Sequence, residues 1–102
     1  MNISDIRERY LEKKVLWQVH CLSRMHEREI SISDIDRTIL SGKIIEEYND
    51  DYPHPSCLIM GNSSGRVIHC VVGMDEERLY MITAYEPCET VFEKDMITRK
   101  EK

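Results

Sequence analysis

The chain has 102 residues, of which 32% are charged and 41% hydrophobic, and its net charge is −5 at pH 7. This length allows one domain, residues 1–102, built around a single core. No run approaches the roughly 20 apolar residues of a membrane span, and the N-terminus lacks the apolar region of a signal peptide, so we expect a cytoplasmic protein without membrane association. The acidic balance opposes binding to a polyanion, because nucleic-acid-binding proteins usually present a basic surface.

The first element predicted is a helix over residues 4–29, with Ser4 as its N-cap. On a helical projection, one side carries the apolar residues Leu11, Val15, Val19, Leu22 and Met25. The opposite side carries Lys13, Trp17, His20, Arg24 and Arg28. A second interpretation stays open, because the β-branched alternation of residues 15–19 also fits an extended segment, with the helix beginning only near His20.

His20, Arg24 and Arg28 follow one another at four-residue steps, which places them within an arc of about 80° on a helix. Like charges at this spacing cost about 0.2–0.5 kcal/mol per pair, so we expect a carboxylate or a bound anion beside them. Residues 1–30 carry six Lys and Arg against five Asp and Glu, a net of +1 on a chain of net −5. The two arginines could therefore bind a phosphate, or they could pair with the acidic cluster around Glu46, Glu47 and Asp50 and only stabilise the fold.

A second helix is predicted over residues 33–41, where Ser31 and Ser33 can each cap the start and Gly42 can end the helix at the C′ position. Strand-like runs then follow at residues 43–48, 57–60, 66–72 and 78–85, with a hairpin loop at 61–65. Helices followed by a meander predict an α+β fold, in which two N-terminal helices pack on a four-stranded antiparallel sheet. The apolar helix residues Val15, Val19, Leu22 and Met25, with Ile35 and Ile39, should lie against Ile45, Ile59, Ile68 and Ile82 or their strand neighbours. The tail from residue 89 onwards keeps Phe92, Met96 and Ile97 and predicts a short docked helix.

The four cysteines, Cys21, Cys57, Cys70 and Cys88, show no motif spacing, so we expect reduced, buried or half-buried thiols. The dipeptides at residues 20–21 and 69–70 each join a histidine to a cysteine, which raises the question of a zinc site. In a strand, however, His69 and Cys70 point to opposite faces and cannot reach one ion. No metal and no cofactor is expected.

Several motifs together resemble a known family. They are the stretch V-H-C-L-S-R-M-H-E-R-E-I-S-I-S-D-I-D-R-T-I-L-S-G-K-I-I-E-E-Y, the run G-R-V-I-H-C-V-V, and the closing M-I-T-A-Y-E-P. The chain resembles the bacterial and archaeal family called domain of unknown function 4258 over a family-like core of residues 19–87, with residues 1–18 as an extension and 88–102 as a tail. The matching positions are His20, Arg24, Arg28, Gly42, Tyr48, Gly65, Arg66, His69, Thr83, Tyr85 and Pro87. The chain departs from the family pattern at Glu29, where the resemblance leads us to expect Gly.

The resemblance implies a distant similarity to the RelE-type and barnase-like ribonuclease fold, and to the toxin half of toxin–antitoxin pairs. Such an enzyme would act on RNA without metal and would have a small antitoxin protein as partner. These expectations rest on analogy between folds.

Metal-free RNA cleavage needs a base for the ribose 2′-hydroxyl, an acid for the leaving oxygen and cations for the phosphorane. His20 and His69 have the ordinary pKa for base and acid, and Arg24 and Arg28 offer forks for phosphate oxygens. Tyr85 could donate to the phosphate or stack on a base. Further substrate contacts are expected from Arg66, Thr83 and Trp17.

Each of these residues also has a structural interpretation. His20 could fill a seam between helix and sheet, and His69 alternates with Val67 and Val71, which favours burial. Tyr85 could hydrogen-bond a helix, and Trp17 could simply pack. The alternative function is therefore a non-catalytic interaction domain that binds a partner protein through its sheet or an open sheet edge.

Overall fold

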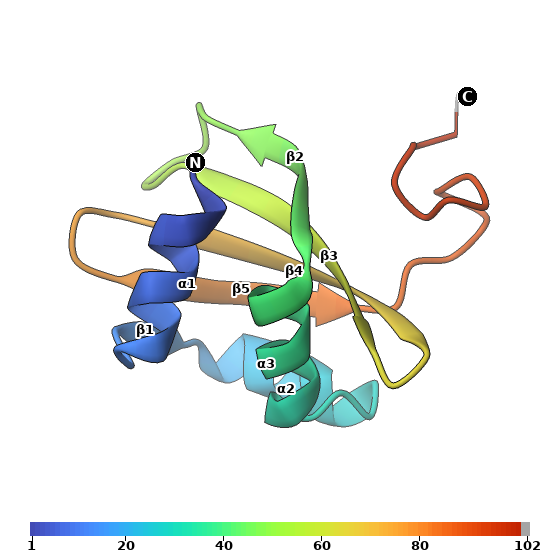
Figure 1. Ribbon diagram of the computed structural model, residues 1–102, viewed down its shortest axis with the longest axis horizontal. Coiled ribbons are helices and arrows are strands. Elements are labelled where there is room, and N and C mark those ends of the chain that lie inside the picture. Colours follow the sequence, from blue (N-terminus) through green and yellow to red (C-terminus); the bar gives the residue numbers. More distant parts are fainter. Residues whose placement is uncertain (101–102) are drawn as a thin grey trace.

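The computed structural model describes residues 1–100, and within them three helices pack on one face of a five-stranded, mostly antiparallel sheet (Figure 1). The α+β class predicted from the sequence is confirmed. In chain order the elements are α1 Ile3–Leu11, β1 Val15–Trp17, α2 Val19–Glu27, α3 Ile32–Ser41, β2 Lys43–Tyr48, β3 Ser56–Ser63, β4 Arg66–Met74 and β5 Leu79–Tyr85.

The prediction of one continuous helix over residues 4–29 is wrong. The chain leaves α1 after Leu11, turns through Lys13, whose φ is 61°, and forms the short strand β1 before α2 begins. This is the alternative interpretation that the β-branched residues had left open. β1 is stable as a strand because it pairs in parallel with β5, with Leu16 opposite Tyr80. The fold therefore contains a third helix and a fifth strand beyond those expected.

Dividing the helix changes which side chains are buried. The buried face of α2 consists of Cys21 and Met25, whereas Val19 and Leu22, predicted to be buried, are exposed. Trp17 does not join the cationic side chains of α2. It lies on β1 with its ring edge-on to Tyr10 of α1, at 6.4 Å between centroids.

The α3 helix follows the sequence prediction closely. Ser31 and Asp34 form a capping box, in which each side chain accepts a hydrogen bond from the other residue's backbone amide. Gly42 ends the helix as predicted. Its φ of −83° is not left-handed, however, so the backbone conformation of a C′ residue does not explain why glycine stands here. A Cβ on Gly42 would lie 2.3 Å from the carbonyl oxygen of Thr38, and one on Gly61 would lie 2.6 Å from the Cα of Thr38. Both glycines allow α3 to approach β3 closely.

The strand order is β1-β5-β4-β3-β2, and β2 to β5 form the antiparallel meander that the sequence predicted. The face toward the helices is apolar and forms the core with α1, α2 and α3. Its fully buried members include Ile35, Ile39, Ile59, Ile68, Cys70, Leu79 and Met81. Ile45 and Ile82, predicted to belong to this core, are only half-buried, and each lies where the register of its strand shifts. We call the opposite side the helix-free face.

The tail, residues 88–100, forms no helix, contrary to the prediction. It is an irregular loop in which Phe92 and Arg99 make an isolated antiparallel bridge, and it follows β5 as the orange-to-red segment of Figure 1. Phe92 is nevertheless buried, because it packs on the helix-free face of the sheet. Among residues 1–100, no helix is long and apolar enough to cross a membrane.

Candidate functional site

The centre of the helix-free face is occupied by His69 of β4. Alternation along β4 turns Ile68 and Cys70 toward the helices and His69 away from them. The register sets His69 opposite Met60 on β3 and opposite Tyr85 on β5. The sheet therefore brings together two of the residues that the sequence nominated for chemistry, His69 and Tyr85.

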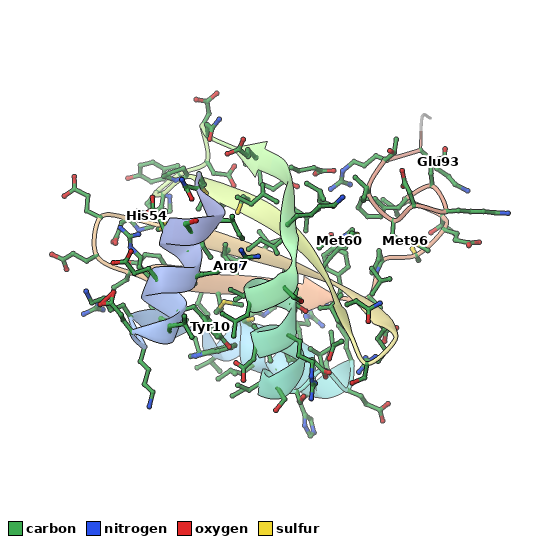
Figure 2. All side chains as sticks on the ribbon, viewed as in Figure 1. Arg7, Tyr10, His54, Met60, Glu93 and Met96 are labelled. Carbon is green, nitrogen blue, oxygen red and sulfur yellow. The ribbon has the colours of Figure 1, made fainter. Side chains whose placement is uncertain are left out.

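The tautomer of His69 follows from its hydrogen bonds. Nε2 lies 2.7 Å from the backbone carbonyl oxygen of Met96, in the tail, and a carbonyl can only accept, so Nε2 carries the proton. Nδ1 is then a free acceptor facing the Tyr85 hydroxyl at 3.4 Å. Figure 2 labels Met96 in the tail and Met60 on the sheet. The arrangement presents a neutral imidazole with one basic nitrogen.

Burial shifts the pKa values of both partners toward their neutral forms. The His69 ring is fully buried, and this burial lowers its pKa, although the bond to Met96 and the charge of Glu46 act in the opposite direction. Burial raises the pKa of Tyr85. At neutral pH the pair is thus an uncharged imidazole beside a protonated phenol.

An ion pair flanks this site between β2 and the tail. Arg99 holds Glu46 by two hydrogen bonds, Nε to Oε2 at 2.8 Å and Nη2 to Oε1 at 3.1 Å, and Tyr48 also donates to Glu46. Burial acts to raise the pKa of Glu46, but the bonds from Arg99 and Tyr48 outweigh it and leave that pKa below its ordinary value. Burial and the bond to Glu46 raise the pKa of Tyr48 to about 12.

Sequence reasoning found Tyr48 only through the family resemblance, and it placed Glu46 in an acidic cluster. It did not identify Arg99, Phe92 or Met96 as neighbours of the site. The available signal was the retention of apolar residues in the tail, which indicated docking but not the surface on which the tail docks.

Arg28 is the member of the cationic series that reaches the site. Within residues 1–100, β5 has no strand partner on its β1 side beyond Met81, because β1 ends at Trp17. Arg28, at the end of α2, fills this position: Nη1 donates to the carbonyl of Ala84 at 2.7 Å and lies 3.4 Å from Thr83 Oγ1. Its positive charge also acts to lower the pKa of Tyr85, against the larger effect of burial.

His20 and Arg24 are not brought to His69. Both are exposed on α2, which packs on the other face of the sheet through Cys21 and Met25. Arg24 pairs with Glu27 at 3.2 Å, and Glu27 is thus the carboxylate expected beside the like charges of this helix. The structure gives His20 no contact with His69 or Tyr85, so the predicted set of five is divided into three residues that converge and two that do not.

Arg66 joins loops instead of facing the helix-free surface. Its guanidinium binds the Glu86 carboxylate at 2.6 Å and the Glu29 carbonyl at 2.9 Å, and it lies 3.5 Å from Asp34. Asp34 also accepts bonds from Ser31 and Ser63, and these bonds hold its pKa below the ordinary value. This network ties α3 to the loop before it and to the ends of β3, β4 and β5.

The tail closes the site to solvent. The rings of Phe92 and His69 meet edge-on at 4.7 Å between centroids, and the Arg99 guanidinium lies 5.0 Å from the centroid of the Phe92 ring. His69 and its neighbour Leu58 have no exposed surface. A substrate could therefore reach the imidazole only after the tail has moved.

The thiols play no part in this site. All four cysteines are free; Cys21, Cys57 and Cys70 are buried as expected, whereas Cys88 is exposed at the start of the tail. Within residues 1–100, no three His, Cys, Asp or Glu side chains converge as a metal site would require.

A family model described as "Domain of unknown function (DUF4258)" matches residues 17–86 of this chain. The match ends before the tail begins, so the segment that covers His69 lies outside the matched region. No curated protein and no solved structure matches the chain.

Proposed function

Since the chain belongs to the DUF4258 family, whose description assigns no activity, we propose from the site itself that it is a metal-independent ribonuclease. The observation that carries the proposal is the pair formed by the buried His69 and the half-buried Tyr85, with the Arg28 guanidinium bound to the strand end that carries Tyr85. Base, acid and cation are the three parts that cleavage through the ribose 2′-hydroxyl needs.

In the proposed reaction, His69 and Tyr85 between them take up and return every proton that moves. Nδ1 of His69 takes the proton of the 2′-hydroxyl, and the 2′-oxygen attacks phosphorus. The 5′-oxygen leaves with the phenolic proton of Tyr85, and the phenolate recovers a proton from the His69 imidazolium beside it. The products are a 2′,3′-cyclic phosphate and a 5′-hydroxyl. Arg28 would stabilise the charge on the phosphorane oxygens.

The directions of the pKa shifts agree with these roles. With the tail in place, a lowered pKa keeps the imidazole of His69 unprotonated and a raised pKa keeps the phenol of Tyr85 protonated, so both groups hold the required protonation states before the tail moves. Both shifts come mainly from burial.

The second part of the proposal is the role of toxin in a toxin–antitoxin pair, with RNA as substrate and a small antitoxin protein as partner. It is supported by the layering of helices on one face of a mostly antiparallel sheet and by a polar cluster on the helix-free face, which fits a RelE-like or barnase-like enzyme. The support is an analogy between folds.

The test uses purified full-length protein with a mixed-sequence RNA in the presence of EDTA. We expect cleavage to 2′,3′-cyclic phosphate ends, and a loss of roughly 10²–10⁴-fold in rate for His69→Gln and Tyr85→Phe. His26→Ala, which removes an exposed histidine of α2, is the matched control and should keep the wild-type rate. Intact RNA after incubation with folded wild-type protein, together with unimpaired bacterial growth on expression, would favour the interaction-domain alternative.

A further inference from the structure

The outer edge of β1 carries backbone groups that no part of the described chain satisfies. β1 is the last strand in the sheet and pairs only with β5. The carbonyl of Lys14 accepts from the Leu79 amide at 2.8 Å, so by alternation the backbone groups of Leu16 also face β5. Those of Val15 and Trp17 face away, and within residues 1–100 they make no backbone hydrogen bond outside the sheet.

Cavities lie on both faces of the sheet beside this edge, and a further one, lined by Lys13, Glu76, Glu77 and Arg78, lies at the start of β1. On the helix side, a cavity of about 540 Å³ is lined by Val15 and Trp17 of β1 together with Tyr10, Leu11, Lys13, Ile32 and Asp36. On the helix-free face, a cavity of about 240 Å³ is lined by Leu16 with Gln18, Asp51, Tyr52, Pro53, His54, Gly73, Tyr80 and Ile82. Figure 2 labels Tyr10 and His54, one from each cavity.

The walls of the two cavities on the faces of the sheet are unusually apolar for exposed surface. Leu11 is 65% exposed, Ile32 53% and Tyr52 95%. Side chains of this size, gathered around one strand, indicate a surface that a partner covers.

The opposite edge of the sheet is protected in the usual ways. β2 has a register shift between Ile44 and Glu46, and its outer residues carry charges that are already paired: Glu46 with Arg99, and Glu47 with the N-terminal amine of Met1. β1 has the shortness typical of a protected edge, but neither a bulge nor a paired charge within its three residues.

We propose that the β1 edge binds an extended segment of a partner protein, which joins the sheet as a sixth strand. A strand directs successive side chains to opposite faces, so alternate apolar residues of the partner would enter the two cavities while its backbone pairs with Val15 and Trp17. This surface shares no residue with the His69 site, and the proposal does not depend on the ribonuclease.

The charges at this edge specify one more property of the partner. Asp36 and Asp51 each line one of the two cavities and accept a hydrogen bond from a neutral hydroxyl, that of Tyr10 and that of Ser56, so both keep their negative charge. Lys13, at the turn into β1, lines the helix-side cavity and makes no ion pair within the described residues. The partner segment should therefore carry a carboxylate next to its apolar residues, at the end that meets Lys13.

The probe is a synthetic peptide, acetyl-Glu-Thr-Leu-Tyr-Val-Lys-Ser-amide, titrated into ¹⁵N-labelled full-length protein. We expect saturable shifts of the Val15 and Trp17 amides. Two N-methylated versions, one modified at Leu and Val and the other at Tyr, test for backbone pairing, because only alternate amides face β1. Strand addition requires that one version loses binding and the other keeps it. Absent binding of the parent peptide, or equal binding of all three, overturns the proposal.

Variants of the protein locate the site. Leu11→Lys and Tyr52→Ser change exposed residues of the two cavities, and each should weaken peptide binding at least tenfold. Val91→Ser, an exposed apolar residue of the tail, is the matched control and should leave binding unchanged. Sedimentation of the peptide-free protein tests whether a second copy of the chain occupies this edge, and a dimer that Leu11→Lys abolishes would overturn the partner proposal. A single-stranded RNA decamer that causes the same amide shifts would also overturn it.

Discussion

The imidazole of His69 donates from Nε2 to the backbone carbonyl of Met96 at 2.7 Å, across 27 residues of sequence. This one bond determines the tautomer of the ring and fastens the tail over it. Phe92 and Arg99 add a ring contact and an ion pair on the same segment. The chemistry of the sheet and the position of the tail are therefore linked, and four predictions test this relationship and its surroundings.

The first prediction concerns the docking of the tail on His69. Phe92→Ala removes the buried ring that packs on His69, so the tail should detach locally and admit water to the imidazole. The pKa of His69 should then rise toward its ordinary value of 6.5, because burial is the main cause of its depression. Titration of the His69 ring signals by NMR measures this. Global stability should fall by less than the ~3–5 kcal/mol typical of a core Phe→Ala change.

Val91→Ala is the control for this prediction, since Val91 is an exposed neighbour in the same tail. It should leave the titration of His69 unchanged. An unaltered pKa in Phe92→Ala would contradict the role of the tail as the cover of this site.

The second prediction is the pH dependence of stability. The folded-state pKa of His69 is lowered below the unfolded value of 6.5, so in the interval between them the unfolded chain binds more protons. The stabilisation is complete above pH 6.5 and is lost as pH falls through the folded pKa. Urea unfolding from about pH 7.5 down to about pH 5 should show this slope, and His69→Gln should remove it.

The carboxylates change the stability of the protein in a separate interval, at lower pH. The pKa values of Asp34 and Glu46 are lowered from 3.8 and 4.5, so their stabilisation is lost only below these values. A slope near pH 6 that persists in His69→Gln would show that another group causes it.

The third prediction concerns Glu29, where the family resemblance led us to expect glycine. Glu29 has φ 56° and follows Arg28, the C-cap of α2. The amide of Ile30 bonds to the Met25 carbonyl at 2.9 Å and that of Glu29 to the His26 carbonyl at 3.2 Å, which is the Schellman pattern with its left-handed C′ residue. A left-handed conformation costs a residue with a Cβ about 1–2 kcal/mol.

Glu29→Gly should therefore stabilise the protein by roughly 0.5–1 kcal/mol, once the larger backbone entropy of unfolded glycine is subtracted. Denaturant unfolding measures the change. Ser23→Gly, inside the same helix, should instead destabilise it, because helical φ gives glycine no advantage there. Equal effects of the two substitutions would exclude this explanation.

The fourth prediction concerns the two arginines of α2. Arg28→Ala removes the guanidinium at the end of β5 and should lower ribonuclease activity by at least tenfold. Arg24→Ala removes only the exposed pair with Glu27 and should change activity by less than twofold. His20→Ala should behave like Arg24→Ala, since His20 lies on the helix side of the sheet. Loss of activity in Arg24→Ala or His20→Ala would place the catalytic surface on α2 instead.

The sequence by itself determined the elements whose causes are local. The Ser31–Asp34 capping box and the alternation along β4 each depend on neighbours within a few residues, and these features therefore appear where they were predicted. The hairpin loop predicted over residues 61–65 is shorter than expected, because residues 61–63 continue β3 and only Ser64 and Gly65 form the turn. Alternation also placed His69 and Cys70 on opposite faces before any tertiary contact was known.

Only the tertiary structure decided the rest. β1 is three residues long and is stable only because β5, more than 60 residues later in the chain, offers it a parallel edge. Local helix propensity could not reveal that competition. The covering of His69 by the tail likewise depends on contacts between Phe92, Met96 and a sheet face formed by distant strands. Burial and tautomer are properties of such packed surroundings, so the sequence nominated His69 and Tyr85 as reactive residues while the fold determined their protonation states and their access to solvent.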